Sequence, residues 1–275
     1  MSYGKGISYV NDKKSSIVLF DMDGTLTEAR RPIGMPMIKA LRELFDQNER
    51  AHIGVVTGSD LEYIKQQMKP LIHKDYNLAR EIHWLPCNGT KYYKLRGAEW
   101  DVINHIDMRH HLGEQKFNNL MRAIVEQQCH IADHKIPLTG HFINYRGSMI
   151  NWCPIGRNAN PTQRSSFEDI DKTFSDQVTL REQYLKRLKS SVRDETIICK
   201  LGGDTSFDVY PKGWDKTYCL KYFEGYNKFF VGDRCEFNGN DSEIYDKLSP
   251  YAWRTTDPEN TIKIIKRNIM PLISN

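Results

Sequence analysis

Short strand-like runs separated by polar segments mark the first part of the chain. Residues 17–20 and 53–56 are continuous apolar runs, and residues 82–85 form a third short strand-like segment. Continuous apolar runs predict strands buried on both faces of a parallel sheet. Residues 36–48 lie between the first two runs and place their apolar side chains on one helical face. Strands that alternate with helices predict an α/β domain.

The pattern changes over residues 94–211, where helical periodicity and strand-like alternation are mixed. The elements predicted there are a helix at 113–128, a hairpin at 141–153, a largely helical segment at 166–188, and a strand pair at 197–201 and 206–210. The α/β pattern then resumes with a strand at 228–231, a strand at 251–254 and a helix at 258–268. This order predicts an α/β parallel-sheet core at residues 1–93 and 212–275 with an α+β domain, residues 94–211, inserted into it.

Composition narrows the class of protein. Hydrophobic residues are 39% and charged residues 27% of the 275, which is ordinary for a soluble globular protein. The net charge of +4 is spread out without a basic run, so no nucleic-acid partner is expected. No apolar stretch reaches membrane-spanning length, so no membrane partner is expected either. The six cysteines have no zinc spacing, and the first sixteen residues lack an apolar signal core; both features favour a cytoplasmic protein.

Two carboxylates follow the first predicted strand in the sequence IVLFDMDGTLT. Asp21 and Asp23 would lie at the carboxyl end of that strand, which is where ligands bind in open α/β sheets. Two ionised carboxylates this close repel each other unless a cation lies between them, and Mg²⁺ suits oxygen ligands. An aspartate neutralised in this way can attack phosphorus and form an aspartyl-phosphate. The alternative is an Asx-turn after a strand, with Gly24 supplying the turn.

Other predicted strand ends supply groups of the same kind. Thr57 and Ser59 follow the second strand, where a hydroxyl can donate to a phosphoryl oxygen, although helix capping would also explain Ser59. Asp233 follows the strand at 228–231, Asp241 lies in the loop after it, and Lys216 adds a positive charge. Taken singly, Lys216 could be a surface lysine and Asp233 a turn residue. Together, several carboxylates and a lysine predict a phosphotransfer site.

The first motif resembles that of the haloacid dehalogenase superfamily, and further stretches resemble its α-phosphomannomutase family. These stretches are FDMDGTLTEARRPI, GSDLEYI, NYRGSMINWCPIGR, SFDVYPKGWDKTYCL and VGDRCEFNGNDSEIYD. The resemblance implies a Rossmann-like core with a type IIB cap, and an enzyme of mannose metabolism and GDP-mannose biosynthesis. That enzyme would interconvert mannose 6-phosphate and mannose 1-phosphate with Mg²⁺ and a hexose 1,6-bisphosphate activator. The resemblance also implies a homodimer formed through the cap.

The resemblance assigns a role to each matching residue. Asp21 would be the nucleophile, Asp23 the general acid and base, and Lys216 a further catalytic group. The metal would be held by Asp21, Asp233 and the backbone carbonyl of Asp23. The substrate would be bound by Arg30, Thr57, Ser59, Arg146, Arg157, Arg164, Ser206 and Asp208.

Elementary chemistry agrees with the assignments in the cap. Guanidinium groups bind phosphate in a bidentate manner, so Arg146, Arg157 and Arg164 could hold the phosphate remote from Asp21. Ser206 and Asp208 alternate along a predicted strand, so both face one side and could take sugar hydroxyls. Two other functions remain open: a sugar-phosphate phosphatase, which differs in how far the cap excludes water, and a non-catalytic sugar-phosphate-binding protein. The intact Asp21 and Asp23 argue against the latter.

Overall fold

The core domain is built around a seven-stranded sheet. The computed structural model describes residues 14–273, so most of the segment considered for a signal lies outside the described residues. The first core segment contains β1 (Ser16–Phe20), α1 (Met35–Asp46), β2 (Ala51–Val56), α2 (Leu61–Gln67), α3 (Lys69–Lys74), α4 (Tyr76–Ala79), β3 (His83–Leu85), the 3₁₀ turn η1 (Cys87–Gly89), β4 (Lys91–Arg96) and β5 (Glu99–His105). The second contains the 3₁₀ segment η2 (Lys216–Phe223), β10 (Asn227–Gly232), α9 (Ser242–Leu248), β11 (Ala252–Arg254), α10 (Pro258–Ile264), the π-helical turn η3 (Ile265–Ile269) and α11 (Met270–Ile273).

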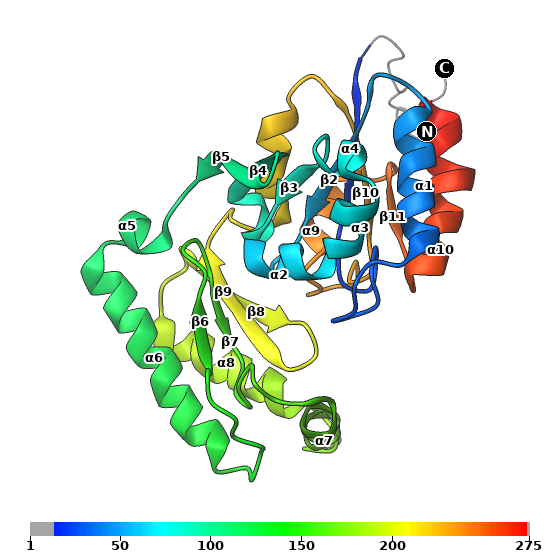
Figure 1. Cartoon of the computed structure of the whole chain (residues 1–275). Helices are drawn as coiled ribbons and strands as arrows, with labels where there is room; N and C mark the ends of the chain where they lie inside the picture. The colour runs from blue at the N-terminus through cyan, green and yellow to red at the C-terminus, as the bar shows by residue number, and fades with distance from the viewer. Residues whose placement is uncertain (1–13, 274–275) are drawn as a thin grey trace, which may run out of the picture.

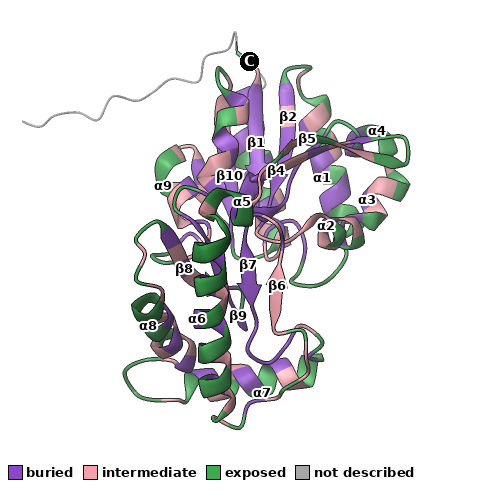
Figure 2. Ribbon diagram, turned by 90° about the vertical axis from the view of Figure 1, so that its left-hand side faces the viewer, coloured by how far each residue is buried: buried purple, intermediate pink, exposed green. Residues whose placement is uncertain are grey.

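The strand order is β11-β10-β1-β2-β3-β4-β5. The strands from β11 to β3 are parallel, and β4 and β5 are added in antiparallel orientation. All five residues of β1 are buried, as Figure 2 shows by colour. Val18 and Phe20 pack into one apolar cluster, while Ile17 and Leu19 pack into another that contains residues of η2 and α9. The predicted strand buried on both faces is therefore confirmed.

The cap is an α+β unit with its own apolar interior. It contains α5 (Met108–Leu112), α6 (Glu114–Ala132), β6 (Ile143–Tyr145), β7 (Ile150–Trp152), α7 (Pro161–Lys172), α8 (Leu180–Val192), β8 (Ile197–Gly202) and β9 (Ser206–Pro211). Its four strands form an antiparallel sheet in the order β6-β7-β9-β8. Trp152 and Phe207 stack on each other with ring centroids 4.4 Å apart, in the same cluster as residues of α6 and α8. In Figure 1 this sheet lies between those helices and the core.

The structure differs from the predicted boundaries in two places. The expected start of the cap at residue 94 falls inside β4, because β4 and β5 pair around a turn at Gly97 and extend the core sheet to His105. The helical segment predicted at 166–188 is two helices, α7 and α8, because Thr179 starts a new helix with its own capping box. The fold class, a parallel-rich α/β core with an inserted α+β cap, is confirmed.

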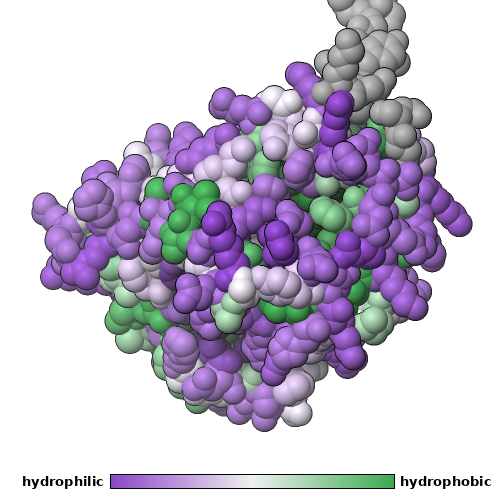
Figure 3. All heavy atoms as spheres, turned by 45° about the horizontal axis from the view of Figure 1, so that its top comes forward, coloured by the Kyte–Doolittle hydropathy of each residue, from purple (hydrophilic) through white to green (hydrophobic). Residues whose placement is uncertain are grey.

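The face of the molecule in Figure 3 is mostly hydrophilic and carries only small hydrophobic patches. Within residues 14–273, no helix combines the length and the apolar character needed to cross a membrane. None of the six cysteines forms a disulfide, as expected for free thiols.

Candidate active site

A polar cavity of about 230 Å³ lies between the carboxyl ends of the core strands and the cap sheet. Residues from both domains line it. Asp21, Asp23 and Asp233 contribute from the core. All of the residues predicted to bind substrate also line it, namely Arg30, Thr57, Ser59, Arg146, Arg157, Arg164, Ser206 and Asp208. The fold therefore brings together residues that are up to about two hundred positions apart in the chain.

Three carboxylates converge at the core end of the cavity. Asp21 follows β1, Asp233 follows the neighbouring strand β10, and Asp241 comes from the loop after β10. One carboxylate oxygen from each lies within 4.8 Å of the others. Burial and the charges of the neighbouring aspartates raise the pKa of Asp21 well above its usual range and that of Asp233 to about 6. This accumulation of negative charge is characteristic of a cation site.

The local structure fits a divalent metal ion. The Oδ1 atom of Asp233 is buried without a hydrogen-bond partner. Gly24 adopts φ +81°, and a Cβ atom there would lie 2.4 Å from Asp233 Oδ2, so glycine is needed for the carboxylate to occupy this position. Hard carboxylate oxygens are the donors that Mg²⁺ prefers. Asp241, predicted only to lie near the site, is a full member of this cluster.

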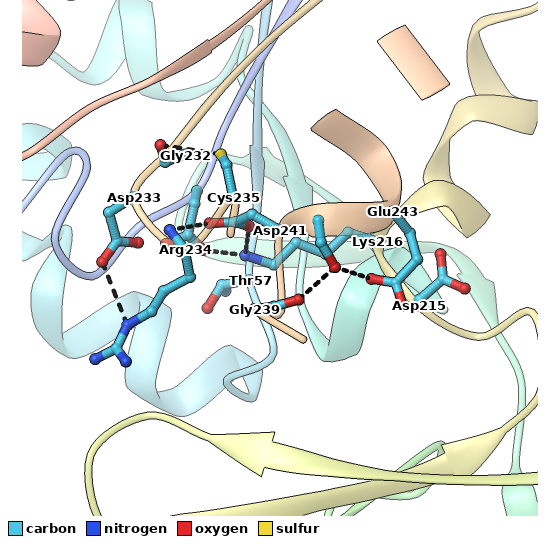
Figure 4. A network of polar contacts seen from close by, with 12 residues as sticks. Thr57, Asp215, Lys216, Gly232, Asp233, Arg234, Cys235, Gly239, Asp241 and Glu243 are labelled. Carbon is cyan, nitrogen blue, oxygen red and sulfur yellow. Dashed lines mark hydrogen bonds and ion pairs between the residues drawn. The ribbon is translucent and has the colours of Figure 1, made fainter. Parts of the chain in front are cut away.

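Lys216 lies outside the cavity lining and balances part of the negative charge of the carboxylate cluster. Its side chain is almost completely buried and forms ion pairs with Asp21 and with Asp241, the latter at 2.5 Å between Nζ and Oδ1. Burial alone would lower the pKa of Lys216, but the two carboxylates raise it above its usual value, so the ammonium stays charged. Figure 4 shows Lys216 directed toward Asp241, with Asp233 and Arg234 on the other side of the cluster.

Asp23 lies beside the carboxylate cluster, and its side chain forms hydrogen bonds outside that cluster. Its Oδ1 atom accepts hydrogen bonds from the Tyr63 hydroxyl at 2.9 Å and from the backbone N–H of Arg30 at 3.1 Å. These hydrogen bonds direct Asp23 Oδ1 toward Tyr63 and Arg30. Tyr63 was not predicted. The signal that could have found it is its place in the first turn of α2, which Asp60 caps at the edge of the cavity.

The cap supplies positive charge that nearby carboxylates neutralise only in part. Among the described residues, Arg157 and Arg164 form no ion pair, and Arg146 has only Asp60 at 4.0 Å. Arg164 instead donates to the hydroxyl of Thr205 and to backbone carbonyls. Burial, followed by repulsion from neighbouring arginines, lowers the pKa values of Arg157 and Arg164. Such a group of cations can be neutralised by a bound anion.

The cap sheet arranges polar side chains on the face toward the cavity. Asn151 pairs with Asp208 across β7 and β9, and its amide donates to Ser206 Oγ at 3.0 Å and to Asp208 Oδ1 at 2.8 Å. The side-chain amide oxygen of Asn151, Oδ1, accepts a hydrogen bond from Arg157 Nη1 at 2.9 Å. Asn151 therefore orients three predicted substrate residues. Sequence reasoning missed it, although its position between Ile150 and Trp152 in a predicted strand gave a periodicity signal.

The core and the inserted cap define a protein of the haloacid dehalogenase fold. Similar folds occur in the Plasmodium falciparum IMP-nucleotidase, with a TM-score of 0.63 and 13% identity over 96% of this chain and 72% of that one. They also occur in the C-terminal domain of the C. albicans trehalose-6-phosphate phosphatase, with a TM-score of 0.56 and 15% identity over 92% of each chain.

Sequence comparison gives a narrower result. The profile of the family described as eukaryotic phosphomannomutase matches residues 38–271. The phosphomannomutase of Solanum lycopersicum is 36% identical over 91% of this chain and 93% of its own length. That of Saccharomyces cerevisiae is 35% identical over 92% of this chain and 94% of its own length. The chain belongs to the eukaryotic phosphomannomutase family.

Proposed function

We propose that this protein is a phosphomannomutase that interconverts mannose 6-phosphate and mannose 1-phosphate. The observation that supports this activity best is the cavity itself, which has a carboxylate cluster at one end and, at the other, arginines that nearby carboxylates neutralise only in part. A hexose 1,6-bisphosphate carries two phosphates, one for each end. A phosphatase needs only the carboxylate end of the cavity. A binding protein would not need a buried, lysine-paired aspartate such as Asp21.

The proposed reaction proceeds through two transfers to and from Asp21. The Asp21 carboxylate attacks the phosphorus of a hexose bisphosphate, the bond from phosphorus to the sugar oxygen breaks, and Asp23 gives that oxygen a proton. The hexose monophosphate can then leave the cavity, or it can reorient so that its other hydroxyl faces Asp21. In the reverse step, Asp23 removes a proton from the other hydroxyl, which attacks the phosphorus and frees Asp21. Ser206 and Asp208 would bind sugar hydroxyls, and the cap arginines would hold the distal phosphate.

The metal in this proposal is Mg²⁺. Asp21 and Asp233, with Asp241 beside them and the carbonyl oxygen of Asp23, would hold it. When bound, the ion supplies charge stabilisation for a transferring phosphoryl group. Lys216 orients Asp21 through its ion pair and offsets part of the effect of burial, which favours the protonated form of Asp21. Thr57 and Ser59, at the end of β2, would donate to phosphoryl oxygens.

A product assay tests the proposed function. The protein is incubated with mannose 1-phosphate, Mg²⁺ and a trace of hexose 1,6-bisphosphate. Mannose 6-phosphate should form, and omission of the bisphosphate should delay or prevent its formation because Asp21 then starts unphosphorylated. Release of inorganic phosphate without mannose 6-phosphate would instead support the sugar-phosphate phosphatase. If neither mannose 6-phosphate nor inorganic phosphate formed, the result would contradict both the mutase function and the phosphatase function.

Removal of Mg²⁺ should stop the reaction without unfolding the protein. The carboxylates lie at strand ends beside two apolar clusters that are complete without a metal, so cooperative unfolding should persist. Added Mg²⁺ should restore activity and raise the melting temperature, because it relieves repulsion among Asp21, Asp233 and Asp241. Calorimetry and activity with chelator and then with excess Mg²⁺ measure both effects. Loss of cooperative unfolding after chelation would mean that the metal is structural.

We further propose a homodimer formed through the cap, a cytoplasmic location and a role in supplying mannose 1-phosphate for GDP-mannose. These three proposals are supported by the family resemblance alone. Light scattering on the purified protein measures the first of them.

A further inference from the structure

The cap hairpin β8–β9 meets the core through two ion pairs. Lys200 of β8 pairs with Glu243 in the first turn of α9, and Asp204 at the hairpin turn pairs with Arg234. Lys200 lies directly opposite Asp208 in the β8–β9 register, so both side chains project from the same face of the cap sheet. The apolar cluster of the cap includes three core residues, Cys87, Trp214 and Tyr218. At the turn of the hairpin, by contrast, the contact with the core is polar.

Arg234 also touches the carboxylate cluster. Its backbone N–H donates to Asp241 Oδ2 at 3.1 Å, and its Nε atom lies 3.6 Å from Asp233 Oδ2, the contact drawn in Figure 4. The same guanidinium reaches Asp204 in the cap through Nη2. A single side chain therefore connects the phosphoryl-transfer end of the cavity to the cap hairpin.

The hairpin held in this way carries residues of the distal end of the cavity. Asp204 is followed by Thr205, which accepts a hydrogen bond from Arg164, and then by Ser206. On the cap side, Arg181 donates to the Gly203 carbonyl at 2.9 Å and pairs with Asp171, which steadies the turn. If the hairpin moved away from the core, its polar face would move with it and the cavity would open on that side.

We propose that the Lys200–Glu243 and Arg234–Asp204 pairs form a clasp that holds the cap closed while Asp21 carries a phosphoryl group. This inference rests on the proposed mutase function. The clasp would determine which oxygen attacks the phosphorus. With the cap closed, a sugar hydroxyl attacks, the phosphorus–Asp21 bond breaks, and Asp23 takes the hydroxyl proton. With the cap open, water attacks instead, Asp23 takes one proton of the water, the same bond breaks, and inorganic phosphate leaves. The four residues are thus positioning residues for the reaction.

Burial indicates that the two pairs contribute unequally. The side chains of Lys200 and Glu243 are 14% and 35% exposed, whereas those of Arg234 and Asp204 are 40% and 52% exposed. Exposed ion pairs are weakened by solvent, so the Lys200–Glu243 pair should contribute more. It also lies outside the cavity lining. Its removal therefore tests the clasp without altering a group that touches substrate.

The test measures the ratio of inorganic phosphate release to mannose 6-phosphate formation. In Glu243→Gln and in Lys200→Gln, this ratio should rise about two- to fivefold, the range expected for loss of one partly exposed ion pair. The charge-reversed double variant Lys200→Glu with Glu243→Lys should return the ratio toward the wild-type value. Glu43→Gln is the matched control, because Glu43 pairs with Lys266 within the core and should leave the ratio unchanged.

The outcomes separate the clasp from the proposed function. A wild-type protein that releases only phosphate would contradict the mutase function itself. A wild-type mutase whose ratio is unchanged in both single variants would overturn the clasp. A raised ratio that the charge reversal does not lower would also overturn it, because local damage rather than the ion pair would then be the cause. High salt should raise the ratio in the wild type more than in Glu243→Gln, since salt weakens a pair that the variant already lacks.

Discussion

Replacement of Asp21 by asparagine is expected to abolish phosphoryl transfer, with a loss of about four orders of magnitude or more in kcat. An amide is a poor nucleophile toward phosphorus and a weaker ligand for Mg²⁺. The side chain is buried between Lys216 and the other carboxylates, so another group cannot easily take its place. The assay is mannose 6-phosphate formation from mannose 1-phosphate, compared with the wild type at saturating bisphosphate.

The same variant should fold as well as the wild type. The pKa of Asp21 is raised by burial and by the neighbouring aspartates, so its ionised form destabilises the metal-free folded state above its normal titration range. Removing that charge should leave the melting temperature at neutral pH equal or higher. Lys216 keeps its ion pair with Asp241 and is not left unpaired. Near-normal transfer in a folded Asp21→Asn protein would mean that the nucleophile is another residue.

Replacement of Arg157 by alanine should impair the hexose phosphate reaction far more than hydrolysis of a small aryl phosphate. Arg157 lines the cavity, donates to Asn151 and has no carboxylate partner within the described residues, so its charge is available to a distal phosphate. Loss of a bidentate charge-assisted contact should cost about 2–4 kcal/mol, or tens to hundreds of fold in kcat/KM. An aryl phosphate has no distal phosphate, so kcat/KM for its hydrolysis should fall only slightly.

Arg157→Lys is the matched control for charge. An ammonium keeps the positive charge but lacks the planar fork, so activity on the hexose phosphate should recover only in part. Values of kcat/KM for both substrates, measured on the wild type and both variants, decide the matter. Equal losses on the two substrates would mean that Arg157 supports the fold or the carboxylate end. No loss on either would remove it from the substrate site.

The core and its acidic residues could be predicted because their signals are local. A buried parallel strand reads as a continuous apolar run, and Asp21 and Asp233 follow such runs directly. Since parallel neighbours end at the same edge of a sheet, their convergence followed from the order of strands. The predicted boundary after residue 93 was wrong because β4 and β5 form an antiparallel hairpin with half-exposed strands, which lacks that apolar signature.

The residues that were missed depend on tertiary pairing. Asn151 acts on Asp208 only because β7 and β9 pair in one register, which neither segment specifies alone. Tyr63 reaches Asp23 because α2 begins at the edge of the cavity. Asp204 and Arg234 lie in two turns that meet only when the cap rests on the core. Side chains that are positioned by the contact between the two domains therefore cannot be identified from the sequence alone.

The most direct test of the account follows a labelled phosphoryl group in a single turnover. The protein is mixed with Mg²⁺ and hexose 1,6-bisphosphate carrying ³²P, quenched in acid, and digested to locate the label; mannose 1-phosphate is then added to a parallel sample. We expect label on the peptide containing Asp21, none in Asp21→Asn, and rapid transfer of the label to mannose 1-phosphate to give a labelled bisphosphate. Label that never becomes attached to Asp21, or that leaves as inorganic phosphate at the same rate with and without the sugar, would contradict it.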